Sequence, residues 1–403
     1  MIQSALQPVG DRNANVRIFL DGLEGDDIPL RITWEQWLDI GPPHDEVPFE
    51  IREVTVRIAR NGYDWDIHGR LYMPATEVQA GLAFVFFHGG ADSEMVFDQT
   101  PDRRPGMARV LAAQGYSVLT ITYPGHYAPE NRWAEPIDAR QPLYLLDRDL
   151  AADEVADRNL KCTFNVILQG AGALAADNLS GRDIIAWGHS TGGPMAAALH
   201  RFTDGNRVIG LAGFGTGGPD GWRKEWREVT GAEKFIQLPV DHMSRRSPDT
   251  YRSSGYEDPA DLCPWGGPDE LFHWAASAHR SQIKTSLCDN QHRGIVEIMP
   301  DYAARTGLGE NEYLDHLADP DSDWLKSIAV LLLVGDNDKG HWVAGEALGS
   351  KREMFMANKY RAGGVKRCHV ALIPRYGHFG FMELYNEKFV YLWLWALKNG
   401  YFS

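Results

Sequence analysis

A serine stands between two glycines in Gly188-His189-Ser190-Thr191-Gly192, after an apolar run and before a helix-compatible run. The spacing G-x-S-x-G has a steric cause. A serine in a tight strand-to-helix turn has a strained backbone, and side chains two positions away on either side would crowd it. The turn would place the Ser190 hydroxyl at a helix N-terminus, which favours developing negative charge. The pattern predicts a nucleophilic serine; the alternative is a glycine-rich turn that only lets a helix pack closely on a strand.

A serine hydroxyl is a weak nucleophile at neutral pH, so it needs a base and a third group that orients the base. His378 follows the last apolar run and lies C-terminal to the serine, which is the order expected for such a site. The acid should follow the preceding apolar run, 330–334, and we predict Asp338 in this role. Asp336 is expected to cap the turn through nearby backbone amides. Asp220 is a further candidate for the acid.

Reaction at a carbonyl carbon also requires backbone N–H donors for the oxygen that becomes negative. One donor should be the amide of Thr191, directly after the serine. The other should come from the loop that begins at His88, where glycines let the backbone approach a substrate. Gly90 is the favoured donor and Gly89 the alternative, and His88 is expected to fix the loop by hydrogen bonds.

Short apolar runs alternate with helical stretches along most of the chain. Runs that are apolar on both faces, with helices between them, are typical of a parallel sheet covered on both sides. We predict strands at 54–58, 67–73, 82–87, 117–122, 184–187, 208–214, 330–334 and 370–373, of which the first two form an antiparallel hairpin. Helices are predicted at 106–114, at 192–202, around 344–362 and at 381–398, and a further helix is predicted to end near residue 177.

The alternation stops between residues 216 and 323, a proline-rich stretch with several tryptophans. About a hundred residues without strand signal are too many for a simple loop in a compact domain. We therefore expect a mostly helical cap inserted between the sixth and seventh strands. The predicted organisation is an N-terminal extension (1–50), a core (51–215 and 324–403) and the cap (216–323).

Tryptophans in the predicted cap have two interpretations. They form the core of the cap, or one or two of them line an apolar cleft over Ser190 and bind a bulky or aromatic group of a substrate. The candidates are Trp222, Trp226, Trp265 and Trp274.

These motifs together resemble the α/β-hydrolase superfamily, in its serine-nucleophile, esterase- or lipase-like branch. The matching features are His88-Gly89-Gly90, the serine turn, the Asp338 loop, the His378 loop and the turn Tyr123-Pro124-Gly125-His126. The resemblance covers residues 51–215 and 324–403. It implies a mostly parallel, eight-stranded sheet with Ser190, Asp338 and His378 as a catalytic triad. Serine at position 190 disfavours the branches that use an aspartate or cysteine nucleophile.

The favoured function is hydrolysis of a carboxylic ester or lactone through an acyl-enzyme. One alternative is a C–C bond hydrolase or lyase that uses the same triad. An alternative of another class is a ligand-binding, receptor-like protein with slow turnover. No subfamily is identified from these residues.

Composition and charge argue against several other classes. A net charge of −15 with scattered basic residues argues against nucleic-acid binding. We see no apolar run near the roughly 18 residues of a membrane span, and no secretory signal at residues 1–4. The four cysteines lack C-x-x-C spacing, so we expect neither a zinc cage nor disulfides, and a cytoplasmic protein.

Two glycine patterns, at 170–175 and 213–218, lack the context of a dinucleotide site, and no metal-binding motif is present. We expect no cofactor, no metal and a small-molecule substrate; the oligomeric state does not follow from the sequence.

Overall fold

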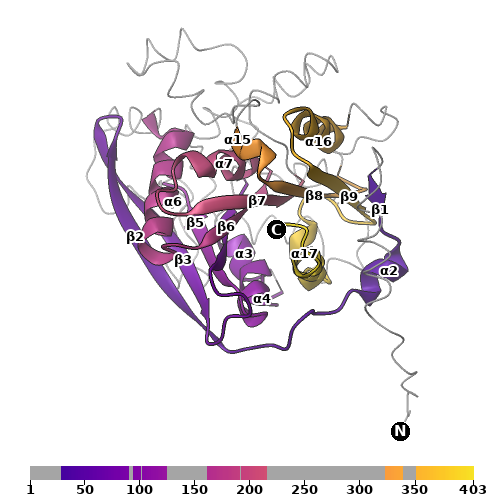
Figure 1. The fold of residues 1–403 in the computed structure, drawn as a ribbon. Coiled ribbons are helices and arrows are strands. Elements are labelled where there is room, and N and C mark those ends of the chain that lie inside the picture. Colours follow the sequence, from indigo (N-terminus) through magenta and orange to yellow (C-terminus); the bar gives the residue numbers. More distant parts are fainter. Residues whose placement is uncertain are drawn as a thin grey trace, which may run out of the picture.

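The computed structural model contains a sheet with helices on both faces (Figure 1). Within the described part of the chain this sheet has nine strands, in the order β1-β9-β8-β7-β6-β4-β5-β3-β2. All neighbours from β1 to β5 pair in parallel, and β5, β3 and β2 pair antiparallel. The structure describes residues 29–89, 94–100, 102–124, 161–190, 192–215, 323–338 and 351–403.

The elements have the following bounds. The strands are β1 (Leu30–Arg31), β2 (Phe49–Arg60), β3 (Tyr63–Pro74), β4 (Leu82–Phe87), β5 (Ser117–Thr122), β6 (Asp183–His189), β7 (Arg207–Phe214), β8 (Ala329–Gly335) and β9 (Arg367–Ile373). The helices are α2 (Trp34–Asp39), α3 (Met95–Asp98), α4 (Met107–Ala113), α6 (Phe164–Asn178), α7 (Gly192–Ala198), α15 (Asp323–Lys326), α16 (Arg352–Ala362) and α17 (Glu387–Lys398). Short 3-10 turns are η4 (Leu199–Arg201) and η8 (Gly380–Met382).

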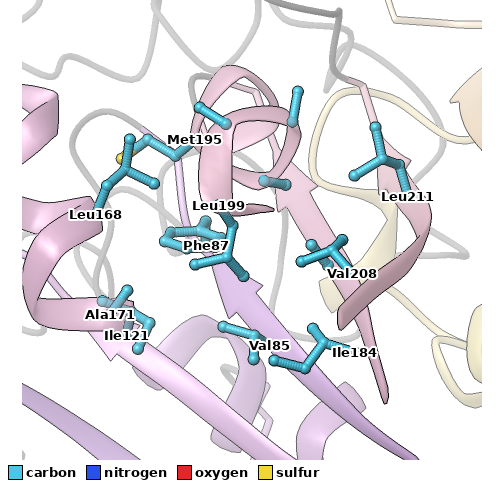
Figure 2. Close-up of a cluster of buried hydrophobic side chains, with 14 of the residues drawn as sticks. Val85, Phe87, Ile121, Leu168, Ala171, Ile184, Met195, Leu199, Val208 and Leu211 are labelled. Carbon is cyan, nitrogen blue, oxygen red and sulfur yellow. The ribbon is translucent and has the colours of Figure 1, made fainter. Parts of the chain in front are cut away.

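Alternate residues of the central strands enter two separate hydrophobic cores, as side chains of a strand point to opposite faces. In β4, Phe84 and Phe86 pack with residues of α3, α4 and α17. Val85 and Phe87 pack on the other face with residues of α6 and α7, where Figure 2 shows Phe87 near Leu199. Both faces of the sheet are therefore buried, which explains why the strand sequences are continuously apolar.

The eight predicted strands are all present as β2 to β9, but the predicted number is wrong by one. The additional strand is β1, whose residues Leu30 and Arg31 pair in parallel with Ala371 and Leu372 of β9. A strand of two residues shows no alternation in the sequence, so no periodic signal could reveal it. Part of the segment 1–50, predicted to be an extension, therefore continues the sheet.

The last helix begins later than predicted. A single helix was expected over 381–398, whereas η8 ends at Met382 and α17 begins at Glu387. Between them Tyr385 has a φ of 64°, which is incompatible with a right-handed helix. The carbonyl oxygen of Leu384 accepts the hydroxyl of Tyr376 at 2.7 Å, a tertiary contact that the helical pattern of the sequence does not encode.

Along the described stretches, no helix is long and apolar enough to cross a membrane. The same stretches contain no group of three or more His, Cys, Asp or Glu side chains that could hold a metal ion. Apart from its last residue, the predicted cap (216–323) lies outside the described residues.

Candidate active site

Ser190 lies in a strained turn between β6 and α7. The strand ends at His189, the helix begins at Gly192, and Ser190 has a φ of 50°. This left-handed conformation is uncommon for a residue with a side chain and is frequent at functional sites. The Gly193 amide donates to the Ser190 carbonyl oxygen at 3.1 Å, which closes the turn.

The two glycines of the motif are required by close backbone contacts. A Cβ at Gly188 would lie 2.5 Å from the carbonyl oxygen of Gly192. A Cβ at Gly192 would lie 2.7 Å from the carbonyl oxygen of His88 and would also overlap the Phe87 carbonyl. The serine turn is thus packed directly on the end of β4, where the His88 loop begins.

His378 and Asp338 form a hydrogen-bonded pair. The distance from His378 Nδ1 to Asp338 Oδ2 is 2.8 Å. The Asp338 side chain is fully buried, whereas 12% of the His378 side chain is exposed. Because a carboxylate can only accept, His378 donates through Nδ1, and in the neutral tautomer with this proton Nε2 is the acceptor nitrogen, as a general base requires.

Ser190 and the histidine–carboxylate pair follow the carboxyl ends of strands in the same parallel part of the sheet. Asp338 follows β8 and His378 follows β9, while Ser190 follows β6. Parallel strands β6, β7, β8 and β9 are neighbours in the sheet, so these ends share one edge. Ligand sites of open α/β sheets lie at this edge.

The loops after β8 and β9 are joined by backbone hydrogen bonds. The Asn337 amide donates to the Tyr376 carbonyl oxygen at 3.1 Å, and the Asp336 amide donates to Ile373 at 3.0 Å. The Asp336 side chain accepts the Arg375 amide at 2.6 Å. Asp336 therefore stabilises the turn that precedes His378. These hydrogen bonds join it to the backbone of that turn, whereas Asp338 bonds to the imidazole itself. Burial raises the pKa of this carboxyl.

His189, which the sequence analysis did not single out, joins the serine turn to the histidine loop. Its Nε2 lies 2.9 Å from the carbonyl oxygen of His378, and because a carbonyl only accepts, this nitrogen donates. The two imidazole rings are 4.7 Å apart, and the His189 ring packs against Phe379 and Phe381 at 5.1 and 4.6 Å. Its position before the serine was the only signal in the sequence.

The loop after β4 is held by His88 and Tyr123. His88 is fully buried, and its Nδ1 lies 2.8 Å from the carbonyl oxygen of Gly89. The Tyr123 hydroxyl donates to the His88 carbonyl at 2.7 Å, and the two rings stack at 3.6 Å. His88 therefore makes hydrogen bonds within this loop, in keeping with the structural role expected for it.

A buried ion network holds the chain where it leaves this loop. Arg70 of β3 lies 3.9 Å from Glu94 and 3.5 Å from Asp98. Arg109 of α4 binds Asp98 through two nitrogens, at 2.9 and 3.0 Å, and the Tyr72 hydroxyl donates to the same carboxylate. Buried charges are tolerated when they are paired in this way. No motif in the sequence predicted this network.

A strained serine turn and a buried histidine–carboxylate pair thus lie at the carboxyl ends of parallel strands in one sheet. Residues 84–390 match the family model described as "Alpha/beta hydrolase family". The chain belongs to this family. A search of curated proteins finds no match.

Solved structures with a similar fold come from several members of the superfamily. MenH from S. aureus is 14% identical over 82% of this chain and 98% of its own, with a TM-score of 0.45. Homoserine O-acetyltransferase from Staphylococcus aureus is 15% identical over 87% and 96%, with a TM-score of 0.46. Haloalkane dehalogenase DbeA from Bradyrhizobium elkani is 14% identical over 87% and 98%, with a TM-score of 0.47.

As a member of the alpha/beta hydrolase family, the chain has the fold class that its motifs resemble. Asp338, His378, Ser190 and Gly89 are among the described residues. The other predicted site residues lie outside them: Thr191, Gly90, Trp222, Trp226, Trp265, Trp274 and the alternative acid Asp220.

The backbone of Gly215, the residue directly after β7, lies so close to the histidine–carboxylate pair that it leaves no room for a side chain. It has a φ of 54°. A Cβ there would lie 2.8 Å from His378 Nδ1 and 2.9 Å from Asp338 Oδ2. The backbone of β7 therefore packs directly against the pair.

Replacing Gly215 with alanine should separate His378 from Asp338 and lower turnover by about a hundredfold, the cost typical of misplacing a catalytic group by an ångström. Gly205→Ala is the matched control, because Gly205 has a φ of 82° but nothing within 4 Å of an added Cβ. The control should lose stability through backbone strain and keep its turnover. Initial rates and thermal melting of both variants measure this, and equal turnover in the two would contradict the prediction.

A second buried carboxyl, Glu383, supports the histidine loop from η8. Its side chain accepts the backbone amide of Gly377, the residue before His378. Burial raises the pKa of Glu383 from 4.5 to about 8, and the Gly377 bond opposes part of that rise. The folded protein therefore keeps this proton at pH values where the unfolded chain has lost it.

From this pKa we expect stability to fall as the pH rises from about 4.5 to about 8, where the unfolded chain binds fewer protons than the folded one. Glu383→Gln keeps an acceptor for Gly377 but cannot titrate, so the decline should be smaller in this variant. The difference should be on the order of several kcal/mol. Urea unfolding near pH 5 and near pH 8 measures it. Parallel declines in the two proteins would show that Glu383 does not titrate in this range.

Proposed function

We propose that the protein is a serine hydrolase that cleaves a carboxylic ester or lactone through an acyl-enzyme on Ser190. The observation that carries the proposal is the 2.8 Å bond between His378 Nδ1 and Asp338 Oδ2 at the strand edge that also bears the serine turn. The His189 hydrogen bond to His378 supports it, because it ties the serine turn to the histidine loop. The strained φ of Ser190 is a further support.

In this mechanism the Ser190 oxygen attacks the carbonyl carbon while His378 Nε2 takes the hydroxyl proton. Asp338 stabilises the imidazolium that forms. The amides of Thr191 and Gly90, with Gly89 as the alternative, donate to the oxyanion. When the tetrahedral intermediate collapses, the C–O bond to the leaving group breaks and His378 protonates the departing oxygen. Water, deprotonated by His378, then attacks the acyl carbon; the bond from that carbon to the Ser190 oxygen breaks, His378 returns the proton to this oxygen, and the acid leaves.

We further propose a bulky or aromatic small molecule as the substrate, in a cleft beneath a cap formed by residues 216–323. Trp222, Trp226, Trp265 and Trp274 would line this cleft. The support is the number of tryptophans in that stretch of sequence, since large aromatic side chains commonly form apolar binding pockets. We also propose that the protein is cytoplasmic.

A fluorophosphonate probe tests the nucleophile, because it bonds covalently to an activated serine. We expect labelling of the native protein on the peptide that contains Ser190, and none after heat denaturation. Absence of labelling would favour the ligand-binding alternative and overturn the proposed function.

A substrate panel tests the bond that is cleaved. We expect turnover of p-nitrophenyl acetate and, more efficiently, of p-nitrophenyl benzoate, whose acyl group is aromatic. Cleavage of a 1,3-diketone without turnover of any ester or lactone would instead assign C–C bond cleavage to the same residues.

A further inference from the structure

The N-terminal segment Leu30–Gly41 precedes the stretch matched by the family model, yet it packs against the loop that carries His378. β1 pairs with the last part of β9, and the Ile32 amide donates to the Leu372 carbonyl at 3.3 Å. Thr33 and Gln36 then form a reciprocal capping box that starts α2. The segment is therefore ordered at the point where the chain leaves β9 for the histidine loop.

α2 inserts Trp37 beneath this loop. Trp37 is fully buried, and its indole nitrogen donates to the Tyr376 hydroxyl at 3.0 Å. The same hydroxyl donates to the Leu384 carbonyl at 2.7 Å. Burial raises the pKa of Tyr376, so the hydroxyl keeps the proton that it donates. The Trp37 ring also packs edge-on against Phe389 at 4.7 Å, which fixes the direction of the indole N–H.

Tyr376 connects this contact to both members of the buried pair. It lies two residues before His378, and its carbonyl oxygen accepts the amide of Asn337, which precedes Asp338. The backbone of Gly335 also packs against the Tyr376 carbonyl so closely that a Cβ could not be accommodated. A shift of Tyr376 would therefore move His378 relative to Asp338.

The other end of the segment is anchored independently of Tyr376. Lys388 of α17 donates to the carbonyls of Leu38 and Ile40 at 2.7 and 2.8 Å. The indole nitrogen of Trp395 donates to the Gly41 carbonyl at 2.9 Å. α2 is thus fixed on α17. Its Trp34 ring packs near the Tyr376 ring at 6.2 Å between centroids, and Trp37 is the residue of α2 that hydrogen-bonds the tyrosine hydroxyl.

We propose that Trp37 is a positioning residue of the active site: through the Tyr376 hydroxyl it holds the His378 loop in register with Asp338. The inference rests on the proposed function, since it assigns Trp37 to the base of that reaction. It also gives residues 30–41, which precede the stretch matched by the family model, a role in positioning the active site.

Three variants test the proposal: Trp37→Phe, Tyr376→Phe and the double variant. Trp37→Phe keeps an aromatic ring but removes the N–H together with part of the indole's volume, so kcat should fall by at least about fivefold, as expected for one buried hydrogen bond, with KM nearly unchanged. Tyr376→Phe should lower kcat further because it removes both bonds of the hydroxyl. The double variant should be no slower than Tyr376→Phe alone, because the indole acts through that hydroxyl.

Trp395→Phe is the matched control, since it removes an indole bond to the same segment without contact to Tyr376. It should keep wild-type kcat and wild-type fluorophosphonate labelling rates, and thermal melting should show that both variants are folded. Equal kcat in Trp37→Phe and Trp395→Phe, or an additive loss in the double variant, would overturn the role of Trp37 while leaving Ser190 labelling intact. No labelling of wild-type Ser190 would overturn the proposed function together with this inference.

Discussion

Ser190→Ala should lower kcat/KM for an ester substrate by about four to six orders of magnitude, because the covalent pathway disappears with the hydroxyl. The backbone donors and the binding site would remain, so KM should change little. The turn itself should survive, since alanine removes only the oxygen and the glycines on either side are unchanged. Initial rates with a chromogenic ester, at concentrations spanning KM, measure the effect.

Two comparisons sharpen this test. Ser190→Ala combined with His378→Ala should be no slower than either single variant, since residues of a triad act as one unit. Ser327→Ala is the control, because its hydroxyl donates to the Trp324 carbonyl at 2.7 Å in an exposed position. A Ser190→Ala protein that retains more than about 1% of wild-type turnover would contradict the nucleophilic role, given the size of triad effects.

Asp338→Asn should lower kcat by about three to four orders of magnitude with little loss of structure. The carboxylate now accepts from His378 Nδ1 in a fully buried position. An asparagine amide can instead donate to Nδ1, which would move the imidazole proton to Nε2 and remove the base that faces the serine. Steady-state kinetics and thermal melting should show lost turnover in a folded protein.

Asp336→Asn is the matched control, because both carboxylates follow β8 and differ in what they contact. Asp336 accepts the Arg375 amide at 2.6 Å, and an asparagine oxygen can accept the same bond. Turnover of this variant should stay within about threefold of wild type, the range of an uncritical substitution. A similar collapse of activity in both variants would mean that the loop, and not the Asp338 carboxylate, is what catalysis requires.

Features encoded by neighbouring residues could be predicted from the sequence. Most of the strands β4 to β9 appear as short apolar runs because both faces of the sheet are covered there, whereas β2 and β3 appear as an alternating hairpin pattern. The serine turn can be recognised within five residues, because a side chain at Gly188 would meet the backbone of Gly192. A side chain at Gly192 would instead meet the end of β4, which is distant in the sequence. Both carboxylates after β8 lie within one short loop pattern: Asp336 accepts the Arg375 amide, and Asp338 is hydrogen-bonded to His378.

Contacts between distant parts of the chain could not be predicted, because no local pattern of residues in the sequence encodes them. β1 is too short for periodicity, and the break between η8 and α17 depends on Tyr376 reaching Leu384. The ion network around Arg70 joins strands and helices whose charges are unremarkable when read along the sequence. Each of these features depends on which helices and strands become neighbours in the fold, and this arrangement cannot be read from local patterns in one sequence.

The sequence by itself therefore determined the family, the sheet and the residues proposed for the chemistry, because these rest on local patterns of glycine, apolar and polar residues. Only the tertiary structure decided how those residues are held. It placed His189 on the His378 backbone, Gly215 against the buried pair, and Trp37 on Tyr376, 339 positions away. The physical reason is that a hydrogen bond acts only over about 3 Å. Which residues come within that distance depends on how strands and helices are arranged in the fold, whatever the separation of the residues along the chain.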